Sequence, residues 1–229
     1  MVKIGVIFYT TYGHTYQLAE KIAEGARSAG AEVELRRIPE TLPDAVVEKM
    51  GGIEARKKWW HIPEVKPEDL KKYDGIAIGG GTRFGNPSAQ WKTFIDSLGG
   101  LWMENALVGK FACAFGSTST QHGGNEMTLL TSFIPLFHLG FTIVGMKSHQ
   151  SLREGGQLSG GTPYGMSTIV GHNAREVSAL ELEGATVQGA HLVDVMTKYG
   201  KPAAPKKVTG LDRAPEGETD AGKKGCWCF

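Results

Sequence analysis

The stretch Ile4-Gly-Val-Ile-Phe-Tyr-Thr-Thr-Tyr-Gly-His-Thr15 joins a short apolar strand, predicted over residues 2–9, to an amphipathic helix that ends at Gly30. Such a turn is a typical anion site, because backbone N–H groups at a helix start point outward and the helix dipole favours negative charge. The turn consists of Thr10, Thr11, Tyr12, Gly13, His14 and Thr15. We therefore predict that a phosphate group binds there.

The composition of this turn indicates which phosphate ligand it suits. A dinucleotide fingerprint needs three glycines, and only Gly13 is present. The nearest match to a nucleoside-triphosphate loop, Gly80 to Gly85, continues with Asn86 and Pro87 and so lacks the lysine and hydroxyl of that motif. A threonine-rich turn without a required positive charge suits a single phosphate, as in a mononucleotide such as FMN. The alternative is an ordinary strand-to-helix turn capped by threonine.

Length and composition exclude several classes of protein. The 229 residues suffice for one large domain, and with a net charge of +1 and no basic cluster in the globular part we expect no nucleic-acid partner. No apolar run approaches the roughly 18 residues of a membrane span, and the first apolar stretch is too short for a signal peptide. The three cysteines, of which Cys113 lies in an apolar strand, offer no disulfide framework and no metal site. This usage favours a reducing, cytoplasmic setting.

Predicted strands and helices alternate along the chain, which is typical of a parallel sheet covered on both faces. The strands are predicted over residues 2–9, 31–38, 74–80, 109–116 and 140–145. Further helices are predicted from Pro87-Ser88 to Gly99-Gly100, near 126–139 with a kink at Pro135, and over 174–199. Residues 43–72 and 146–172 are long insertions, which are usually functional or form interfaces. We predict a doubly wound, five-stranded α/β domain over residues 1–200 and a disordered tail over 201–229.

Ligands of such a sheet bind beyond the carboxyl ends of the strands, where the strand order reverses. Three predicted strands end in suitable loops: Thr10 to Thr15, Gly79 to Asn86, and Gly116 to Gly124. The second loop is rich in glycine, so its backbone can approach a flat ring closely. The third is a run of hydroxyl side chains. Convergence of the three loops predicts one shared site.

Four motifs carry a resemblance to a known family: Tyr12-Gly13-His14, Thr82-Arg83-Phe84-Gly85-Asn86, Gly99-Gly100-Leu101-Trp102 and Gly160-Gly161-Thr162-Pro163-Tyr164-Gly165. Through them the chain resembles the WrbA-type, flavodoxin-like NAD(P)H:quinone oxidoreductases, in register from about residue 2 to 199. The second and fourth motifs are fairly specific to this group, so the likeness exceeds a shared fold.

The resemblance implies roles for individual residues. The first loop would hold the FMN phosphate, and Thr82, Arg83 and Phe84, followed by Gly85 and Asn86, would contact the isoalloxazine ring. The other wall would be formed by Ser117, Thr118, Ser119, Thr120, Gln121 and His122. Trp102 would line the substrate cavity, Tyr12 would help receive the nicotinamide, and His138 would reach the flavin site.

Each of these roles has a plainer alternative. Phe84 and Trp102 could be core aromatics, His138 a buried structural histidine and Arg83 a surface ion-pair partner. The register of His122 is open, because its loop is about one residue longer than the family pattern. We assign no firm catalytic acid or base, although His138 is a candidate.

The resemblance also implies an activity. FMN-dependent two-electron reduction of quinones to hydroquinones by NAD(P)H would follow ping-pong kinetics, because both substrates would use one site over the flavin in turn. The family resemblance further implies a homo-tetramer or homo-dimer. One alternative is a one-electron flavodoxin-type carrier, although such carriers are short and strongly acidic, unlike this chain. Another is a flavin-binding regulatory scaffold at a membrane surface.

The C-terminus motivates that last alternative. Cys226 is fourth from the end and Phe229 is last, which matches a prenylation motif, and Lys223-Lys224 would add attraction to an anionic leaflet. S-acylation is a further alternative, as is a tail with unmodified thiols. Use of the prenylation motif would imply a eukaryotic, fungal-like member of the group.

Overall fold

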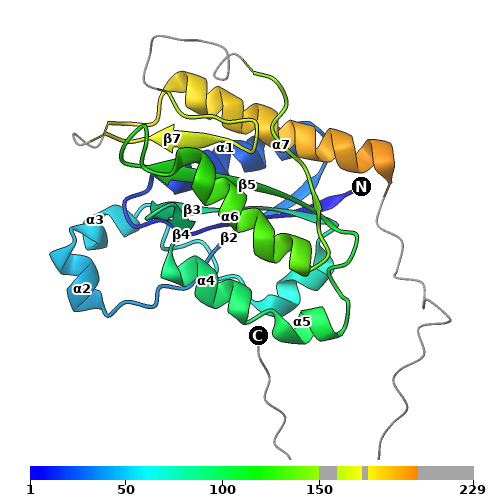
Figure 1. The fold of residues 1–229 in the computed structure, drawn as a ribbon, viewed down its shortest axis with the longest axis horizontal. Coiled ribbons are helices and arrows are strands. Elements are labelled where there is room, and N and C mark those ends of the chain that lie inside the picture. The colour runs from blue at the N-terminus through cyan, green and yellow to red at the C-terminus, as the bar shows by residue number, and fades with distance from the viewer. Residues whose placement is uncertain (150–158, 172–174, 201–229) are drawn as a thin grey trace, which may run out of the picture.

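The computed structural model describes residues 1–149, 159–171 and 175–200, which form a parallel sheet covered by helices on both faces (Figure 1). The central strands are β1 (Lys3–Phe8), β2 (Glu32–Arg37), β3 (Gly75–Arg83) and β5 (Phe111–Thr118), with β6 (Thr142–Ile143) at one edge. Their order is β2-β1-β3-β5-β6, and each neighbouring pair is parallel. The predicted fold class and five-stranded core are confirmed.

The edge strand beside β5 is divided into two short pieces. β6 pairs only with the first residues of β5, and β7 (Ser167–Ile169) pairs in parallel with residues 116–118 at its other end. The predicted strand over 140–145 was therefore too long, and β7 was not predicted. The N–H of Val144 still bonds to the carbonyl of Ala112 on β5, but two residues later the N–H of Met146 bonds to the carbonyl of Pro163 instead. A short hairpin strand, β4 (Asn86–Pro87), pairs back onto the end of β3.

Two helices cover each face of the sheet. α1 (His14–Ser28) and α7 (Ala179–Tyr199) pack on one face, and α4 (Ala89–Asp96) and α6 (Asn125–His138) pack on the other. Successive strand side chains feed the two cores alternately: Ala77 of β3 contacts the α1 side, whereas Ile76 and Ile78 contact the α4 side. α6 remains helical through Pro135.

Two predicted helix ends differ from the structure. The helix after Ser88 ends at Asp96, and Gly99-Gly100 open a second short helix, α5 (Gly99–Met103), instead of only ending the first. The last helix begins at Ala179 instead of residue 174, because Ser178 caps it.

Glycine allows α1 and α7 to lie very close together. A Cβ atom on Gly25 would come within 1.9 Å of the carbonyl oxygen of Thr186, and one on Gly189 within 2.0 Å of that of Ile22. The two helix backbones therefore touch directly, which fixes α1 on the sheet.

The first insertion folds into short helical pieces: α2 (Asp44–Lys49), α3 (Gly52–Arg56) and the 3₁₀ helix η1 (Pro67–Lys72). Trp59 is buried against Tyr16 of α1. The Trp60 ring lies within about 4 Å of two guanidinium groups, at 4.0 Å from Arg37 and 4.2 Å from Arg56. This insertion therefore packs onto the sheet beside the start of α1.

Cys113 is a buried core residue, as predicted, and burial raises the pKa of its thiol to about 12. Among the described residues, no helix is long and apolar enough to cross a membrane, and no three His, Cys, Asp or Glu side chains gather as metal ligands. The predicted tail over 201–229, with Cys226, lies outside the described residues.

Candidate functional site

A cleft of about 420 Å³ opens at the carboxyl ends of β1, β3 and β5. This volume is in the range of small-ligand pockets, and the position is the edge where parallel sheets bind ligands. The predicted residues that line it are Thr10, Thr11, Tyr12, His14, Thr15, Thr82, Arg83, Ser117, Thr118 and Ser119. The three predicted loops thus converge as expected.

The turn between β1 and α1 requires glycine. Gly13 has a φ of +98°, and a Cβ atom there would lie 2.9 Å from the Trp59 ring. The Gly13 N–H donates to Oγ1 of Thr10 at 2.9 Å, which closes the turn. The buried Trp59 therefore supports the turn from behind and leaves its other side facing the cleft.

The start of α1 is open to an anion. Its N-cap is Gly13, no side chain in the part of the chain that the structure describes accepts a hydrogen bond from its first N–H groups, and its first turn holds no acidic residue. The first N–H groups of a helix lack partners within the helix, so an uncapped start favours an anionic ligand. These donors and the threonine hydroxyls fit a phosphate monoester such as that of FMN.

A hydroxyl pair joins the first and third loops. The Oγ1 atom of Thr15 lies 3.0 Å from Oγ of Ser117, and Thr15 is almost fully buried. The pair fixes the α1 start against the end of β5. One proton of the two hydroxyls serves the pair itself, which leaves the other able to donate to a ligand in the cleft.

The second loop places an aromatic ring in solvent. Phe84 is fully exposed and has a φ of +52°, an unusual backbone conformation for a bulky residue. Thr82 is held from behind, since Thr128 of α6 donates to its hydroxyl at 2.7 Å. A more open groove of about 520 Å³ continues from the cleft past Phe84, Gly85, Thr120 and His122. The core-aromatic alternative for Phe84 is wrong.

The charges around the cleft are mixed. Lys58 and Arg83 line it with Glu176. Burial lowers the pKa of His14, so its imidazole is neutral near pH 7 in spite of the nearby Glu176 carboxylate. A neutral imidazole in the first helical turn does not compete with an anionic ligand for the helix start.

Two predicted residues lie at the amino-terminal end of the strands, opposite the cleft. Trp102 belongs to α5, next to Glu104, which pairs with Lys71 just before β3 at 2.5 Å. His138 is the exposed last residue of α6, whose Thr128 and Thr131, nearer its start, donate to Thr82 and Gly85 of the second loop. The structure thus brings neither residue to the cleft of its own chain. Since both are substantially exposed, neither is the buried residue of its plainer alternative.

Of the remaining predicted residues, Gln121 and Asn86 are exposed on their loops beside the site and line neither the cleft nor the groove. Gly81 lies in the predicted second loop, but sequence reasoning missed several other lining residues: Tyr9, Gln17, Lys58, Val170, Gly171 and Glu176. The stretch Met166-Ser-Thr-Ile-Val170, whose Thr, Ile and Val favour a strand, was the signal for β7 and for the residues that follow it.

The start of α7, which follows β7 in the chain, is closed in the sense that side chains already cap its first backbone groups. Ser178 caps α7 and accepts from the N–H of Glu181 at 3.2 Å, while the Glu181 carboxylate accepts from the N–H of Ser178 at 2.8 Å. The same buried carboxylate accepts from the N–H of Gly160 at 2.8 Å and from Arg175 at 2.6 Å. Burial alone would raise the pKa of Glu181, but these hydrogen bonds together lower it.

Comparison with known proteins places the chain in a family. The family described as Flavodoxin matches residues 6–140. A protein of Methanosarcina barkeri named NAD(P)H dehydrogenase (quinone) is 48% identical over 205 residues, covering 86% of this chain and 99% of its own. A protein of Aromatoleum aromaticum with the same name is 46% identical over 197 residues, covering 85% and 95%.

Solved structures agree on the fold. A flavodoxin, WrbA-like protein from Agrobacterium tumefaciens superimposes with a TM-score of 0.60 at 23% identity, covering 87% of this chain and 100% of its own. A flavodoxin from the domain Archaea gives a TM-score of 0.56. The predicted family resemblance is confirmed: the chain belongs to the flavodoxin family, in the group that includes the proteins named NAD(P)H dehydrogenase (quinone).

Proposed function

We propose that the cleft binds FMN and that the protein reduces quinones with NAD(P)H. The observation that carries the proposal is the uncapped start of α1, which faces a cleft lined by threonine and serine hydroxyls. The relatives named NAD(P)H dehydrogenase (quinone) support the reaction class. FMN supplies the electron-transfer chemistry when bound.

The residues of the chain bind and orient the ligands. The first N–H groups of α1 and the hydroxyls of Thr10 and Thr15 hold the phosphate. The backbone of the second loop, from Gly81 to Phe84, contacts the ring. Gly81 has no side chain to hold the ring away, and the protein atom nearest to a Cβ there, Oγ of Ser117, would be 3.5 Å distant. Tyr12, half exposed at the mouth of the cleft, is the contact for the nicotinamide.

One slot over the ring serves both substrates in turn. The test is a titration of the purified protein with FMN, followed by steady-state kinetics with NADH or NADPH and benzoquinone. We expect a tight complex and parallel double-reciprocal lines. Intersecting lines without competition between the two substrates would contradict the shared slot, and failure to bind FMN would contradict the cofactor.

The same measurements separate the alternatives. A one-electron carrier would bind FMN and exchange electrons with a protein partner, but it would not turn over benzoquinone with NADH. A membrane-surface scaffold would bind flavin without significant turnover with any quinone.

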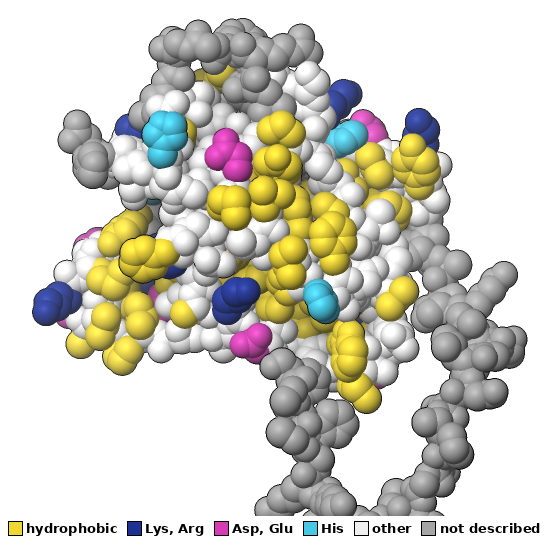
Figure 2. All heavy atoms as spheres, viewed as in Figure 1, with side chains coloured by type: hydrophobic (Ala, Val, Ile, Leu, Met, Phe, Trp, Pro, Cys, Tyr) yellow, Lys and Arg dark blue, Asp and Glu magenta, His cyan; other side chains and the backbone are white. Residues whose placement is uncertain are grey.

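We also propose that copies of this chain associate through an exposed apolar face of α6. Met127, Ile134 and Phe137 are each more than half exposed, at 53%, 58% and 57%, and Figure 2 shows hydrophobic side chains gathered over α6. Apolar patches of this kind mark interaction surfaces. Association would account for the positions of Trp102 and His138, because they would reach the cleft of a neighbouring copy in a dimer or tetramer.

Sedimentation of Ile134→Glu, compared with wild type, tests this association. We expect the variant to be monomeric and to lose quinone turnover while its FMN affinity changes little. A wild-type protein that sediments as a monomer with full turnover would contradict the proposal.

For the tail we propose that Cys226 is lipidated and attaches the protein to a membrane surface. The support is the sequence motif at the C-terminus together with Lys223-Lys224. Fractionation of cells that express wild type or Cys226→Ser tests it. We expect only the wild type in the membrane fraction, and equal distribution of both would contradict the proposal.

A further inference from the structure

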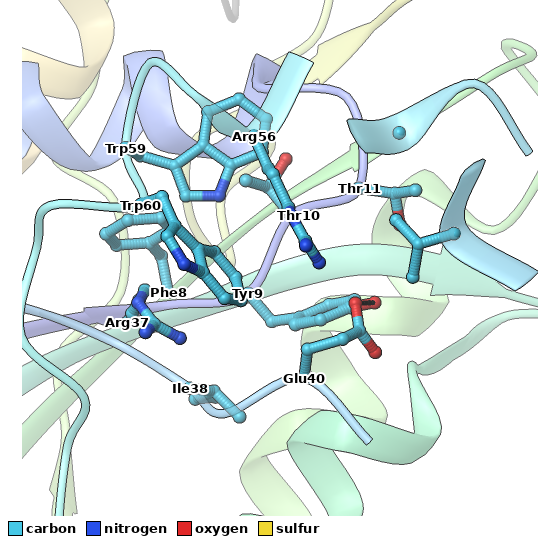
Figure 3. A pocket seen from close by; sticks show the side chains of 12 residues that line it. Phe8, Tyr9, Thr10, Thr11, Arg37, Ile38, Glu40, Arg56, Trp59 and Trp60 are labelled. Carbon is cyan, nitrogen blue, oxygen red and sulfur yellow. Dashed lines mark hydrogen bonds between the residues drawn. The ribbon is translucent and has the colours of Figure 1, made fainter. Parts of the chain in front are cut away.

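Two arginines contact the ring of Trp60 in the first insertion. The Cζ atom of Arg37 lies 4.0 Å from the ring centroid, and that of Arg56 lies 4.2 Å from it. Figure 3 shows the three side chains around a small pocket that Thr10 and Thr11 also line. Because Trp60 is 41% exposed, its own burial explains little of this position, whereas the face of an indole attracts cations.

Each of the two guanidinium groups is held by further hydrogen bonds. Arg37, the last residue of β2, donates from Nη1 to Glu64 at 2.7 Å and from Nε to the carbonyl of Ile62 at 2.9 Å. Arg56, the last residue of α3, donates from Nη1 to Asp44 at 2.9 Å. The two carboxylates offset the repulsion between positive groups that share one ring. The ring of Trp60 therefore joins α3 to the end of β2.

α3 and the residues before it contact the turn between β1 and α1. A Cβ atom on Gly52, the first residue of α3, would lie 3.3 Å from both Cγ2 and the carbonyl oxygen of Thr11. The carbonyl of Met50 accepts from the hydroxyl of Tyr12 at 3.1 Å. The first insertion thus contacts two successive residues of the turn.

The residue before Trp60 supports the next position of the turn. A Cβ atom on Gly13 would come within 2.9 Å of the Trp59 ring, and that ring also packs on Tyr16 of α1 with centroids 5.8 Å apart. The N–H groups of Trp59 and Trp60 both bond to the carbonyl of Arg56, at 3.1 and 2.9 Å. The two tryptophans therefore share one compact turn, and a shift of Trp60 moves the support behind Gly13.

The helices of the insertion are too short to hold this arrangement alone. α2 has six residues and α3 has five, so their positions depend on contacts with the rest of the domain. We propose that Trp60 is a positioning residue, whose contacts with Arg37 and Arg56 keep the first insertion against the turn between β1 and α1. The N–H groups at the start of α1 are then set for a phosphate group before the ligand arrives. The choice of FMN as that ligand rests on the proposed function.

The chain offers a matched control at the end of α7. The Nζ atom of Lys198 lies 5.4 Å from the ring centroid of Tyr199, which is 70% exposed. Tyr199→Leu therefore removes an exposed ring and its contact with a cation, but it touches neither the first insertion nor the cleft. Trp60→Leu removes the ring beside the two arginines, whereas Trp60→Phe keeps an aromatic face for them.

The first test measures hydrogen exchange by NMR in cofactor-free protein. The N–H of Gly13 donates to Oγ1 of Thr10 within the turn, so its exchange reports how firmly the turn is held. We expect this exchange to be about fivefold faster in Trp60→Leu and unchanged in Tyr199→Leu. Equal exchange of Gly13 in wild type and Trp60→Leu would overturn the proposal.

The second test compares titrations with FMN and with riboflavin, which lacks the phosphate. We expect Trp60→Leu to weaken FMN binding about tenfold and riboflavin binding less than about twofold, because only the phosphate contacts the supported turn. Trp60→Phe should restore FMN binding to within about threefold of wild type. Equal losses for the two flavins, or an equal loss in Tyr199→Leu, would mean a general loss of stability and overturn the proposal.

A double-mutant cycle tests whether Trp60 acts together with Arg56. We expect Arg56→Met to weaken FMN binding, and the double variant with Trp60→Leu to bind within about twofold of Trp60→Leu alone. Additive losses would contradict the joint action of the ring and the guanidinium group.

The tests separate this inference from the proposed function. If wild type binds neither flavin, the cofactor assignment fails, and the exchange of the Gly13 N–H still decides whether Trp60 holds the turn. If wild type binds FMN and reduces quinone while Trp60→Leu matches it in exchange and affinity, the positioning role alone fails.

Discussion

α1 and α7 lie on the same face of the sheet, but only the start of α7 is capped by side chains. α7 begins with Ser178 and a buried Glu181, which together satisfy the helix start and its surroundings. α1 begins with Gly13, without a side-chain cap and without an acidic residue in its first turn. A closed start adds stability, whereas an open one reserves its donors for a ligand.

The two helix starts differ in how much they contribute to the stability of the fold. A capping box typically contributes about 1 kcal/mol to a helix. α1 lacks this contribution and instead depends on its packing against α7, where Gly25 and Gly189 bring the two backbones together. The site is thus supported by a contact that lies well inside the domain.

The largest expected effect is at the closed start. Glu181→Gln leaves Arg175 without its buried carboxylate, so we expect the free energy of unfolding to fall by about 3–5 kcal/mol. Chemical denaturation measures it. Glu24→Gln is the control, because its carboxylate is exposed and pairs with Lys21 on the same helix, and we expect a change below about 1 kcal/mol. Equal stability of Glu181→Gln and wild type would contradict the comparison.

The same carboxylate predicts a pH dependence. Because the folded pKa of Glu181 is lowered from 4.5, its stabilising contribution is complete above that pH and is lost as the pH falls through the lower folded value. Melting temperatures of wild type should therefore drop more steeply below pH 4.5 than those of Glu181→Gln. Parallel pH profiles for the two proteins would refute this assignment.

The next effect concerns the open start. Gly13→Ala forces a side chain into a positive-φ position against Trp59, so we expect FMN binding to weaken about 10- to 100-fold. Gly30→Ala is the matched control, since Gly30 also has a positive φ, of +91°, but has open space around it. Both variants should lose about 1–2 kcal/mol of stability, and only Gly13→Ala should lose affinity. Unchanged FMN binding by Gly13→Ala would remove the turn from the site.

A smaller effect is expected from a single hydroxyl. Thr15→Val keeps the shape of the side chain but removes the partner of Ser117, and we expect FMN affinity to fall about tenfold. Thr93→Val removes a hydroxyl that donates to the carbonyl of Ala89 in its own helix, and it should leave affinity unchanged. Titration with FMN distinguishes them, and similar values for both variants would argue against a hydroxyl contact with the ligand.

The smallest effect is on His14. Because burial lowers its pKa from 6.5 in the folded protein, protonation opposes folding, and stability should decline as the pH falls below 6.5. A bound phosphate would favour the charged imidazole, so we expect FMN to raise the pKa of His14. NMR titration with and without FMN measures it. The pKa of the control residue His191, on α7 away from the cleft, should not change on addition of FMN. If FMN leaves the pKa of His14 unchanged, the phosphate binds elsewhere.

The open start could be predicted from sequence because its signals are local. The apolar run before Thr10 and the single glycine at Gly13 define the strand, the turn and the helix within one stretch. The convergence of three loops followed from the geometry of parallel sheets. The closed start has a local signal as well, the capping box of Ser178 and Glu181, although the last helix was predicted to begin at residue 174. What could not be predicted is that the Glu181 carboxylate also accepts from the N–H groups of Gly160 and Ile169, because these residues are distant in sequence.

The positions of Trp102 and His138 show another limit. Motifs specify which residues a family uses, but they do not say which edge of the sheet or which copy of the chain supplies them. Trp102 lies on α5, beyond the end of α4, and His138 is the last residue of α6, so both lie at the far end of the strands, and that follows only from the path of each helix. Tyr9 was missed because a tyrosine at a strand end reads as core.

The divided edge strand has a consequence for how such proteins diversify. Since β6 and β7 attach separately to β5, the segment between them departs from and returns to one rigid support. Lengthening or shortening that excursion changes no pairing elsewhere, and loop closure adds little free energy as length grows. The segment between β6 and β7 can therefore vary in length and sequence among related proteins, while the pairing of the strands in the sheet stays the same.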